Sequence, residues 1–338
     1  MVSIELAKKI AWTVLLQKGN DFYQSRQQVK GFYARGRPIC DKEMLDEVKL
    51  LPPIHTMIHN HTMIPSFEDK FSHWIIDNMF NNIKGLENYQ PDISQGATQS
   101  FDSFYIKHGH KKIKMFFGEY LYHIVVRQKL NMPYDFITSY DQLQEGDALV
   151  ISVPFCDTGN VDFDLDKIFK HCDTKNIPVL LDCAYFPIAY NIDIDLNYDC
   201  IDTICFSLSK LFPIAHARVG MRYTKKGFED GQKLHSNINY DNRISAGIGL
   251  HFINKFRSDH VVEKYILAHK KFIKAFGLKP SNTILFADGD NTWIEYGRHD
   301  ILKAYGLEDD WKQYHNRLCF TELYENLSIA EEVINVYN

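Results

Sequence analysis

The sequence lacks the features that mark membrane-spanning and nucleic-acid-binding proteins. No apolar run approaches the roughly 20 residues that a transmembrane helix needs. The 38 lysines and arginines nearly balance the 43 aspartates and glutamates, so the net charge of -5 provides no positive surface for nucleic acid or anionic lipid. Basic pairs such as Lys111-Lys112 are short and scattered, as is typical of solvated faces. We therefore expect neither a nucleic-acid nor a membrane partner.

The sequence also lacks a disulfide framework. Its seven cysteines are an odd number and show no C-x-x-C spacing. Several of them, such as Cys183 and Cys205, lie in apolar runs, which predicts buried, reduced thiols in a reducing compartment. The short apolar stretch from Ala11 to Leu16 is not followed by a small-residue cleavage site, so we expect no signal peptide. These features together predict a cytoplasmic protein.

What the sequence does contain, in its middle part, is an alternation of short apolar runs with segments of helical periodicity. The expected strands are 148–153, 178–182, 201–207 and 218–223, and the expected helices are 98–108, 120–130 and 165–175. Strands that alternate with helices are typical of βαβ units. The fold class is therefore predicted to be α/β, with a mostly parallel central sheet and flanking helices.

The C-terminal part has a different pattern, which predicts a smaller α+β domain. A long amphipathic helix is expected at 259–276, followed by short strands at 283–287 and 292–296 and by a last helix. The resulting division is a mainly helical N-terminal segment that packs with the small domain (1–50), a large domain (51–258) and a small C-terminal domain (259–338).

Polar residues follow the ends of the predicted strands. Asp182 ends one strand, and Ser207, Ser209 and Lys210 follow the next. Ligands of open α/β sheets bind at the carboxyl ends of the strands, so these residues and the loop 154–159 are expected on one rim. Lysine forms an imine with an aldehyde, while hydroxyls bind phosphate. The rim therefore predicts a phosphorylated aldehyde cofactor, pyridoxal 5′-phosphate.

Other residues fit the same pocket, although each has an ordinary structural alternative. Asp182 could pair with the pyridine nitrogen or serve as a loop or N-cap aspartate. Tyr185 could donate to the ring's phenolic oxygen or belong to the core. Thr98, which follows Gly96 and Ala97 at a helix start, could bind phosphate or only begin a helix. Arg218 could bind phosphate or form a surface ion pair.

Taken together, these motifs resemble the fold-type I pyridoxal-phosphate enzymes, specifically the class I/II aminotransferase family that includes aspartate and histidinol-phosphate aminotransferases. The resemblance runs from about residue 89 to 223 and depends most on Asp182-x-Ala184-Tyr185, Ser207-x-Ser209-Lys210 and Arg218-x-Gly220. It implies a transferase of this fold that acts as a homodimer on small amino-acid and keto-acid substrates.

The resemblance also implies a role for each site residue. Lys210 holds the cofactor as a Schiff base and shuttles a proton, and Asp182 and Tyr185 complete the catalytic set. Arg317 grips the substrate carboxylate, although a packing role is the alternative. Tyr120 stacks on the cofactor ring. The implied cofactor-binding residues are Gly96, Ala97, Thr98, Tyr120, Cys156, Asp182, Tyr185, Ser207, Ser209, Lys210 and Arg218.

The sequence departs from the family pattern in one loop. The usual Asn-Pro-Thr-Gly reads Cys156-Asp157-Thr158-Gly159 here, and a thiol is a poor substitute for the asparagine that bonds the cofactor's 3-hydroxyl oxygen. This change leaves the reaction open. An aminotransferase is the first hypothesis. A lyase, replacement or cyclisation enzyme on the same scaffold is the second, and a non-catalytic binding protein is the third.

A histidine cluster, His55, His59 and His61, has two interpretations. Its H-x-x-x-H-x-H spacing could bind zinc, but no HExxH motif and no companion cysteine or aspartate cluster accompanies it. We therefore predict no metal site. The cluster is instead expected near the active site or the dimer interface. One histidine there could replace the tyrosine that a neighbouring subunit usually sends to the phosphate.

Overall fold

A seven-stranded sheet forms the centre of the computed structural model, which describes residues 3–17, 36–296 and 315–337. The strand order is β2-β9-β8-β6-β5-β3-β4. The strands are β2 (Tyr89–Ser94), β3 (Lys112–Phe116), β4 (Tyr134–Ile137), β5 (Asp147–Ser152), β6 (Val179–Asp182), β8 (Ile201–Ser207) and β9 (Gly220–Lys225). Strand β9 is antiparallel to both of its neighbours, and all other pairs are parallel. The predicted mostly parallel sheet is confirmed.

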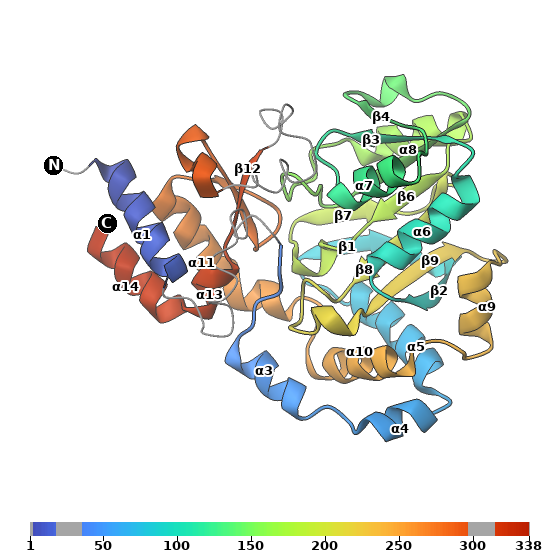
Figure 1. The fold of residues 1–338 in the computed structure, drawn as a ribbon, viewed down its shortest axis with the longest axis horizontal. Helices are drawn as coiled ribbons and strands as arrows, with labels where there is room; N and C mark the ends of the chain where they lie inside the picture. Colours follow the sequence, from blue (N-terminus) through green and yellow to red (C-terminus); the bar gives the residue numbers. More distant parts are fainter. Residues whose placement is uncertain (1–2, 18–35, 297–314, 338) are drawn as a thin grey trace.

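Helices cover both faces of this sheet (Figure 1). The helices of this region are α5 (Met63–Ile76), α6 (Ala97–His108), α7 (Leu121–Lys129), α8 (Leu165–Thr174), α9 (Gly231–Asn237) and α10 (Arg243–Lys255). Strand β5 is buried along its whole length, and its side chains alternate between two apolar clusters. Val150 packs with Phe101 and Phe104 of α6, whereas Leu149 and Ile151 belong to the larger cluster. Burial on both faces explains its continuous apolar run.

Smaller elements extend this region. Strands β1 (Asn81–Lys84) and β7 (Ile192–Asp195) form a parallel pair apart from the main sheet. Two short helices, α3 (Lys42–Lys49) and α4 (Ile54–His59), lead into α5, and α4 packs on α10. No described helix is both long enough and apolar enough to cross a membrane.

The C-terminal elements gather at the other end of the molecule (Figure 1). Helix α11 (His260–Phe276) ends at Gly277, whose φ of 64° is left-handed and favours glycine. An antiparallel sheet follows, with β10 (Lys279–Pro280), β11 (Phe286–Gly289) and β12 (Asn316–Cys319), and the chain continues into α13 (Thr321–Glu325) and α14 (Leu327–Tyr337). Helix α1 (Ile4–Gln17) packs against α13 and α14.

One strand prediction in this region is wrong. Residues 292–296 belong to a 3-10 helix, η6 (Asn291–Tyr296), because Asp290 accepts hydrogen bonds from both the N–H and the hydroxyl of Thr292 and turns the chain. The indole of Trp293 is buried against Trp12 and Phe276, with ring-centroid distances of 5.8 and 5.9 Å. Trp293, which made this segment look like a strand, is thus an apolar residue that packs on α1 and α11. The strand expected at 283–287 begins later, at Phe286.

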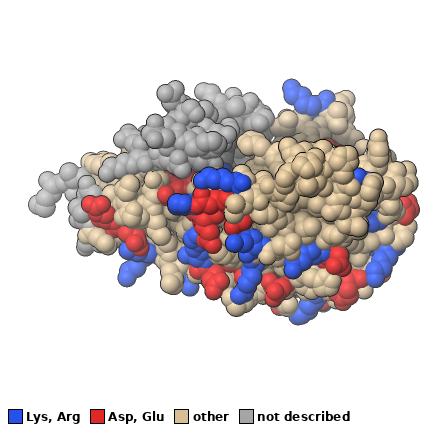
Figure 2. Space-filling model, turned by 90° about the horizontal axis from the view of Figure 1, so that it is seen from below, with Lys and Arg blue, Asp and Glu red and all other residues tan. Residues whose placement is uncertain are grey.

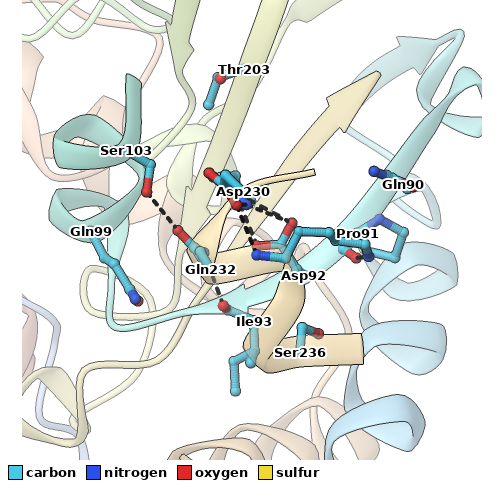
Figure 3. Close-up of polar contacts among 12 residues, drawn as sticks. Gln90, Pro91, Asp92, Ile93, Gln99, Ser103, Thr203, Asp230, Gln232 and Ser236 are labelled. Carbon is cyan, nitrogen blue, oxygen red and sulfur yellow. Dashed lines mark hydrogen bonds and ion pairs between the residues drawn. The ribbon is translucent and has the colours of Figure 1, made fainter. Parts of the chain in front are cut away.

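A buried ion cluster ties helix α9 to the edge of the sheet. The guanidinium of Arg222 on β9 contacts Asp92 on β2 at 3.0 Å and Asp230, the N-cap of α9, at 2.6 Å. Figure 3 shows Gln232 between Ser103 of α6 and Ile93 of β2, and Gln232 hydrogen-bonds both at 3.1 and 3.0 Å. The chain thus supplies a partner for each charge of this cluster.

Candidate active site

A pocket lies where strands β5, β6 and β8 end. The last residue of each strand, Ser152, Asp182 and Ser207, lines it. Its wall is made by Ala97, Thr98, Phe101, Tyr120, Ser152, Cys156, Asp182, Ala184, Tyr185, Ser207, Ser209, Lys210 and Arg218. Every predicted cofactor-binding residue except Gly96 is in this set. The parallel strands bring together side chains that are distant in sequence, as expected at the carboxyl edge of such a sheet.

Lys210 lies in the turn after β8, and its amine is inside the pocket. Nζ donates to the carbonyl oxygen of Gly36 at 2.7 Å and lies 6.0 Å from the ring centroid of Tyr185. Burial lowers the pKa of Lys210, and the guanidinium groups of Arg317 and Arg218 add to the effect. A lower pKa favours the neutral amine, which is the nucleophilic form.

Asp182 is a carboxyl group in an apolar setting. One of its oxygens accepts the N–H of Ala184 at 2.9 Å and the thiol of Cys205 at 3.7 Å. Burial raises the pKa of Asp182 to about 6. Among the described residues, Asp182 has no ion pair with a lysine, arginine or histidine. A cationic N–H donor in the pocket would therefore stabilise its charged form.

An anion cradle forms at the N-terminus of helix α6. The Arg218 guanidinium donates to the hydroxyls of Thr98 at 3.3 Å and Ser209 at 3.4 Å. Gly96, the N-cap of α6, has a φ of 69°, and a Cβ there would overlap the guanidinium. The N–H of Ser209 donates to the hydroxyl of Ser207 at 3.2 Å. A guanidinium, hydroxyls and a helix N-terminus together suit a phosphate group.

Aromatic side chains form the remaining walls. Tyr120 precedes helix α7, is 40% exposed and has its ring centroid 6.5 Å from that of Phe101. Tyr185 is buried edge-on against Phe286, with ring centroids 5.2 Å apart. Burial raises the pKa of Tyr185, so its hydroxyl stays protonated and able to donate. A flat ring can therefore meet an aromatic face and a phenol donor here.

Arg317 on β12 lies beside the pocket without lining it. Its guanidinium donates to the carbonyl oxygen of Cys156, contacts the Cys156 sulfur at 3.8 Å and lies 4.2 Å from the ring centroid of Phe286. Arg317 is thus held against the loop that carries Cys156, close enough to Lys210 for its charge to lower the pKa of that amine. The predicted role of Arg317 in gripping a carboxylate stays a prediction.

The histidine cluster lies on the surface, on helix α4 and just after it. His55 and His59 belong to α4, His61 follows it, and all three side chains are exposed. The described residues contain no group of three histidine, cysteine, aspartate or glutamate side chains placed to hold a metal ion. None of the three histidines lines the pocket.

The sequence-based reasoning missed several residues of the site. Ser152 could have been found, because it is the polar residue next to the end of the expected strand 148–153, just as Asp182 is the polar residue at the end of its own strand. Phe101 is recognisable only as a helical apolar residue. Gly36 contacts Lys210 across 174 residues of sequence, and no local motif marks it.

Comparison with known proteins gives a clear result at the level of fold. No protein-family model and no curated protein sequence matches the chain. Solved structures do match. The aspartate aminotransferase from Thermus thermophilus with maleate has 14% identity and a TM-score of 0.63, with 98% of this chain and 96% of that chain covered.

Two further solved structures give the same picture. The histidinol-phosphate aminotransferase from Clostridium acetobutylicum has 14% identity and a TM-score of 0.59, with coverages of 90% and 98%. The tyrosine aminotransferase from Leishmania infantum has 14% identity and a TM-score of 0.61, with coverages of 95% and 97%. The chain therefore has the α/β fold of these aminotransferases over nearly its whole length.

Proposed function

We propose that the protein is a pyridoxal 5′-phosphate-dependent aminotransferase that moves an amino group between an amino acid, or another amino compound, and a keto acid. One observation carries the proposal. Lys210, Asp182 and the Arg218 cradle face a single pocket in a chain that has the aminotransferase fold. An amine, a carboxyl group and an anion site at one strand edge match the three reactive parts of this cofactor.

The residues of the pocket fit the cofactor part by part. The phosphate would be held by the hydroxyls of Thr98, Ser207 and Ser209 and by the guanidinium of Arg218. Asp182 would meet the pyridine nitrogen, Lys210 would bind the aldehyde carbon, and Tyr120 would stack on the ring. When bound, the cofactor supplies an electron sink for the charge that develops at the substrate's Cα.

The chain's own residues would carry the proton and set the orientation. The lowered pKa of Lys210 leaves its amine free to accept the proton from the substrate's Cα and to return it. Asp182 would stabilise a proton on the ring nitrogen. Tyr185 would donate to the 3-hydroxyl oxygen of the cofactor, and Arg317 would orient the substrate carboxylate with its planar fork.

An absorbance measurement tests this proposal. The purified protein with added cofactor should show a visible yellow band that is lost on borohydride treatment, and Lys210→Ala should lack it. The exposed residue Lys226 offers the matched control, because Lys226→Ala should keep the band. A wild-type protein that shows no band would contradict the proposal and favour a non-catalytic binding protein.

A second reaction on the same scaffold is favoured by one feature, Cys156. A thiol stands where the family has an amide, and its backbone carbonyl holds Arg317. Elimination, replacement or cyclisation would then compete with transamination, because the protein's groups decide which bond breaks. Incubation with a panel of amino acids separates the two. Keto acid together with pyridoxamine absorbance supports an aminotransferase, and ammonia or a cyclic product without that absorbance supports the alternative.

We infer a homodimer whose surface includes helix α4. Five apolar side chains are exposed on α4, on α9 and just after α9, namely Ile54, Ile58, Leu234, Ile238 and Tyr240. Arg243 at the start of α10 bridges the two segments, because its guanidinium donates to the carbonyl oxygens of Ile58 at 2.8 Å and Asn239 at 3.0 Å.

An area without charged side chains on the face seen from below (Figure 2) is consistent with a dimer surface there. Figure 2 shows lysine, arginine, aspartate and glutamate side chains interspersed on the face seen from below, beside a broad area without them. Sedimentation tests the inference: a monomer at micromolar concentration would contradict it. Ile58→Glu should weaken the dimer, whereas the exposed Ile106→Glu on α6 should not.

We also propose a cytoplasmic location and keep the division into residues 1–50, 51–258 and 259–338. All seven cysteines are free and buried, which suits a reducing compartment. The packing of α1 on α13 and α14 supports an N-terminal segment that joins the small domain.

A further inference from the structure

Glu119 is a buried carboxyl group that the proposed chemistry does not use. Glu119 lies in the connection between β3 and α7 and is 0% exposed. A carboxyl group is rarely buried without a specific set of partners, because its removal from water is costly.

The partners of Glu119 belong to two walls of the pocket. The backbone N–H and the hydroxyl of Ser152 donate to Glu119 at 2.8 and 2.6 Å. The N–H of Tyr120 donates to the carboxyl group at 3.3 Å. The Ser152 hydroxyl in turn accepts the N–H of Cys156 at 2.9 Å. A continuous set of hydrogen bonds thus runs from Tyr120 through Glu119 and Ser152 to Cys156.

The charge state of Glu119 fits this arrangement. Burial and, to a smaller extent, the nearby carboxyl group of Asp182 raise the pKa of Glu119 to about 8, although the hydrogen bonds from Ser152 and Tyr120 act to lower it. Glu119 has no ion pair with a basic side chain in the described part of the chain. Two carboxyl groups in one buried region do not both ionise readily, so a neutral Glu119 leaves the charge to Asp182.

We propose that Glu119 is a positioning residue of the active site, which holds the Tyr120 backbone on one wall of the pocket and, through Ser152, the Cys156 loop on another. The consequence for the cofactor pocket depends on the proposed function. The positioning itself does not, because every contact involved is within the chain.

Substitutions that keep or remove these hydrogen bonds test the proposal. Glu119→Gln keeps the shape and one acceptor, and its amide can donate to the Ser152 hydroxyl. Glu119→Ala and Ser152→Ala break the connection at two different points. Glu145→Gln, at an exposed loop position, is the matched control.

The first measurement is the alkylation of Cys156 by iodoacetamide in protein without added cofactor, followed by mass spectrometry of each cysteine peptide. Cys156 is 4% exposed, and the fully buried Cys172 on α8 reports general unfolding. Glu119→Ala and Ser152→Ala should each speed the alkylation of Cys156 by roughly tenfold or more, the size expected when one buried hydrogen bond is lost, and should leave Cys172 unchanged. Glu119→Gln and the control should match the wild type.

The second measurement is the dissociation constant of pyridoxal 5′-phosphate. The two alanine variants should weaken binding by similar factors, and the double variant should be no weaker than either, because both act through one connection. The proposal would be overturned if Cys156 were alkylated in Ser152→Ala at the wild-type rate, or in Glu119→Gln at the rate of Glu119→Ala. If the wild type does not bind the cofactor, the proposed function fails while the alkylation rates still decide the role of Glu119. If Glu119→Ala does not fold, Ser152→Ala and Glu119→Gln keep the test complete.

Discussion

The central sheet carries two groups of buried charges that are built in opposite ways. At its β2–β9 edge, Arg222 contacts both Asp92 and Asp230, so the cation and the two carboxylates satisfy one another. At the carboxyl ends of β6 and β8, Asp182 has only an N–H and a thiol as partners, and the amine of Lys210 has a carbonyl oxygen. The first arrangement is complete within the chain, and the second is not.

The difference separates structural from functional charge. Buried ions that are fully paired hold elements together, and removing one partner leaves the other uncompensated. Asp182 and Lys210 lack such partners, and buried titratable groups of this kind gather at functional sites. The missing ion-pair partner, and not the pKa shift, distinguishes the two regions, because burial raises the pKa of Asp92 to about 7 and that of Asp182 to about 6. Mutations in the two regions should therefore act on different properties.

The largest expected effect is on stability at the paired cluster. Arg222→Met keeps an apolar side chain but leaves Asp92 buried without its cation. We expect the free energy of unfolding to fall by about 3–5 kcal/mol, measured by urea denaturation. Adding Asp92→Asn to this variant should recover part of the loss, because the remaining Asp230 is partly exposed to water. If the Arg222→Met protein were as stable as the wild type, the charges of the paired cluster would not be structural, and the cluster would not differ from the pocket in this respect.

The matched arginine at the pocket should behave differently. Arg218→Gln removes the guanidinium from the anion cradle, so the affinity for pyridoxal 5′-phosphate should fall by roughly tenfold to a hundredfold, as expected for a lost charge-assisted hydrogen bond. The free energy of unfolding without cofactor should change by less than about 0.5 kcal/mol. Equilibrium titration of the cofactor absorbance measures the first quantity. A large loss of stability with unchanged affinity would argue that Arg218 is structural.

The smallest expected effect has the opposite sign. The pKa of Asp182 in the folded protein, about 6, lies above its ordinary value of 3.8, so the contribution of Asp182 to stability is present below pH 3.8 and is lost as the pH rises through 6. Asp182→Asn removes this loss. A pKa shift from 3.8 to about 6 corresponds to about 3 kcal/mol, and the burial of the new amide group offsets part of this gain. Without cofactor, the variant should therefore be more stable than the wild type by about 1–2 kcal/mol at pH 7, and this advantage should be lost as the pH falls toward 3.5.

Two further measurements sharpen this last comparison. Cofactor affinity should fall in Asp182→Asn, because an amide cannot stabilise a protonated pyridine nitrogen. Asp193→Asn, at an exposed position on β7, should change neither stability nor affinity. A destabilised Asp182→Asn protein at pH 7 would contradict the assignment of Asp182 as a buried carboxyl group without an ion-pair partner.

Much of the site could be predicted from sequence because one rule applies along the central sheet. Apolar runs identify the parallel strands, and the residues that follow them must lie at one edge. This rule found Asp182 and Ser207. It failed at 292–296, where the aromatic pattern resembles a strand but Asp290 turns the chain and Trp293 packs between helices. Short segments of this kind are decided by their neighbours.

By itself, the sequence determined the α/β class, which polar residues follow which strand, and the amine, carboxyl, hydroxyl and guanidinium groups that line the pocket. These follow from local periodicity and from residues close to one another in the chain. Only the tertiary structure decided that Gly36 contacts Lys210, that Arg317 contacts Cys156 and that Glu119 joins two pocket walls. Those contacts connect segments that lie 33 to 174 residues apart, and their formation depends on packing that no local pattern contains.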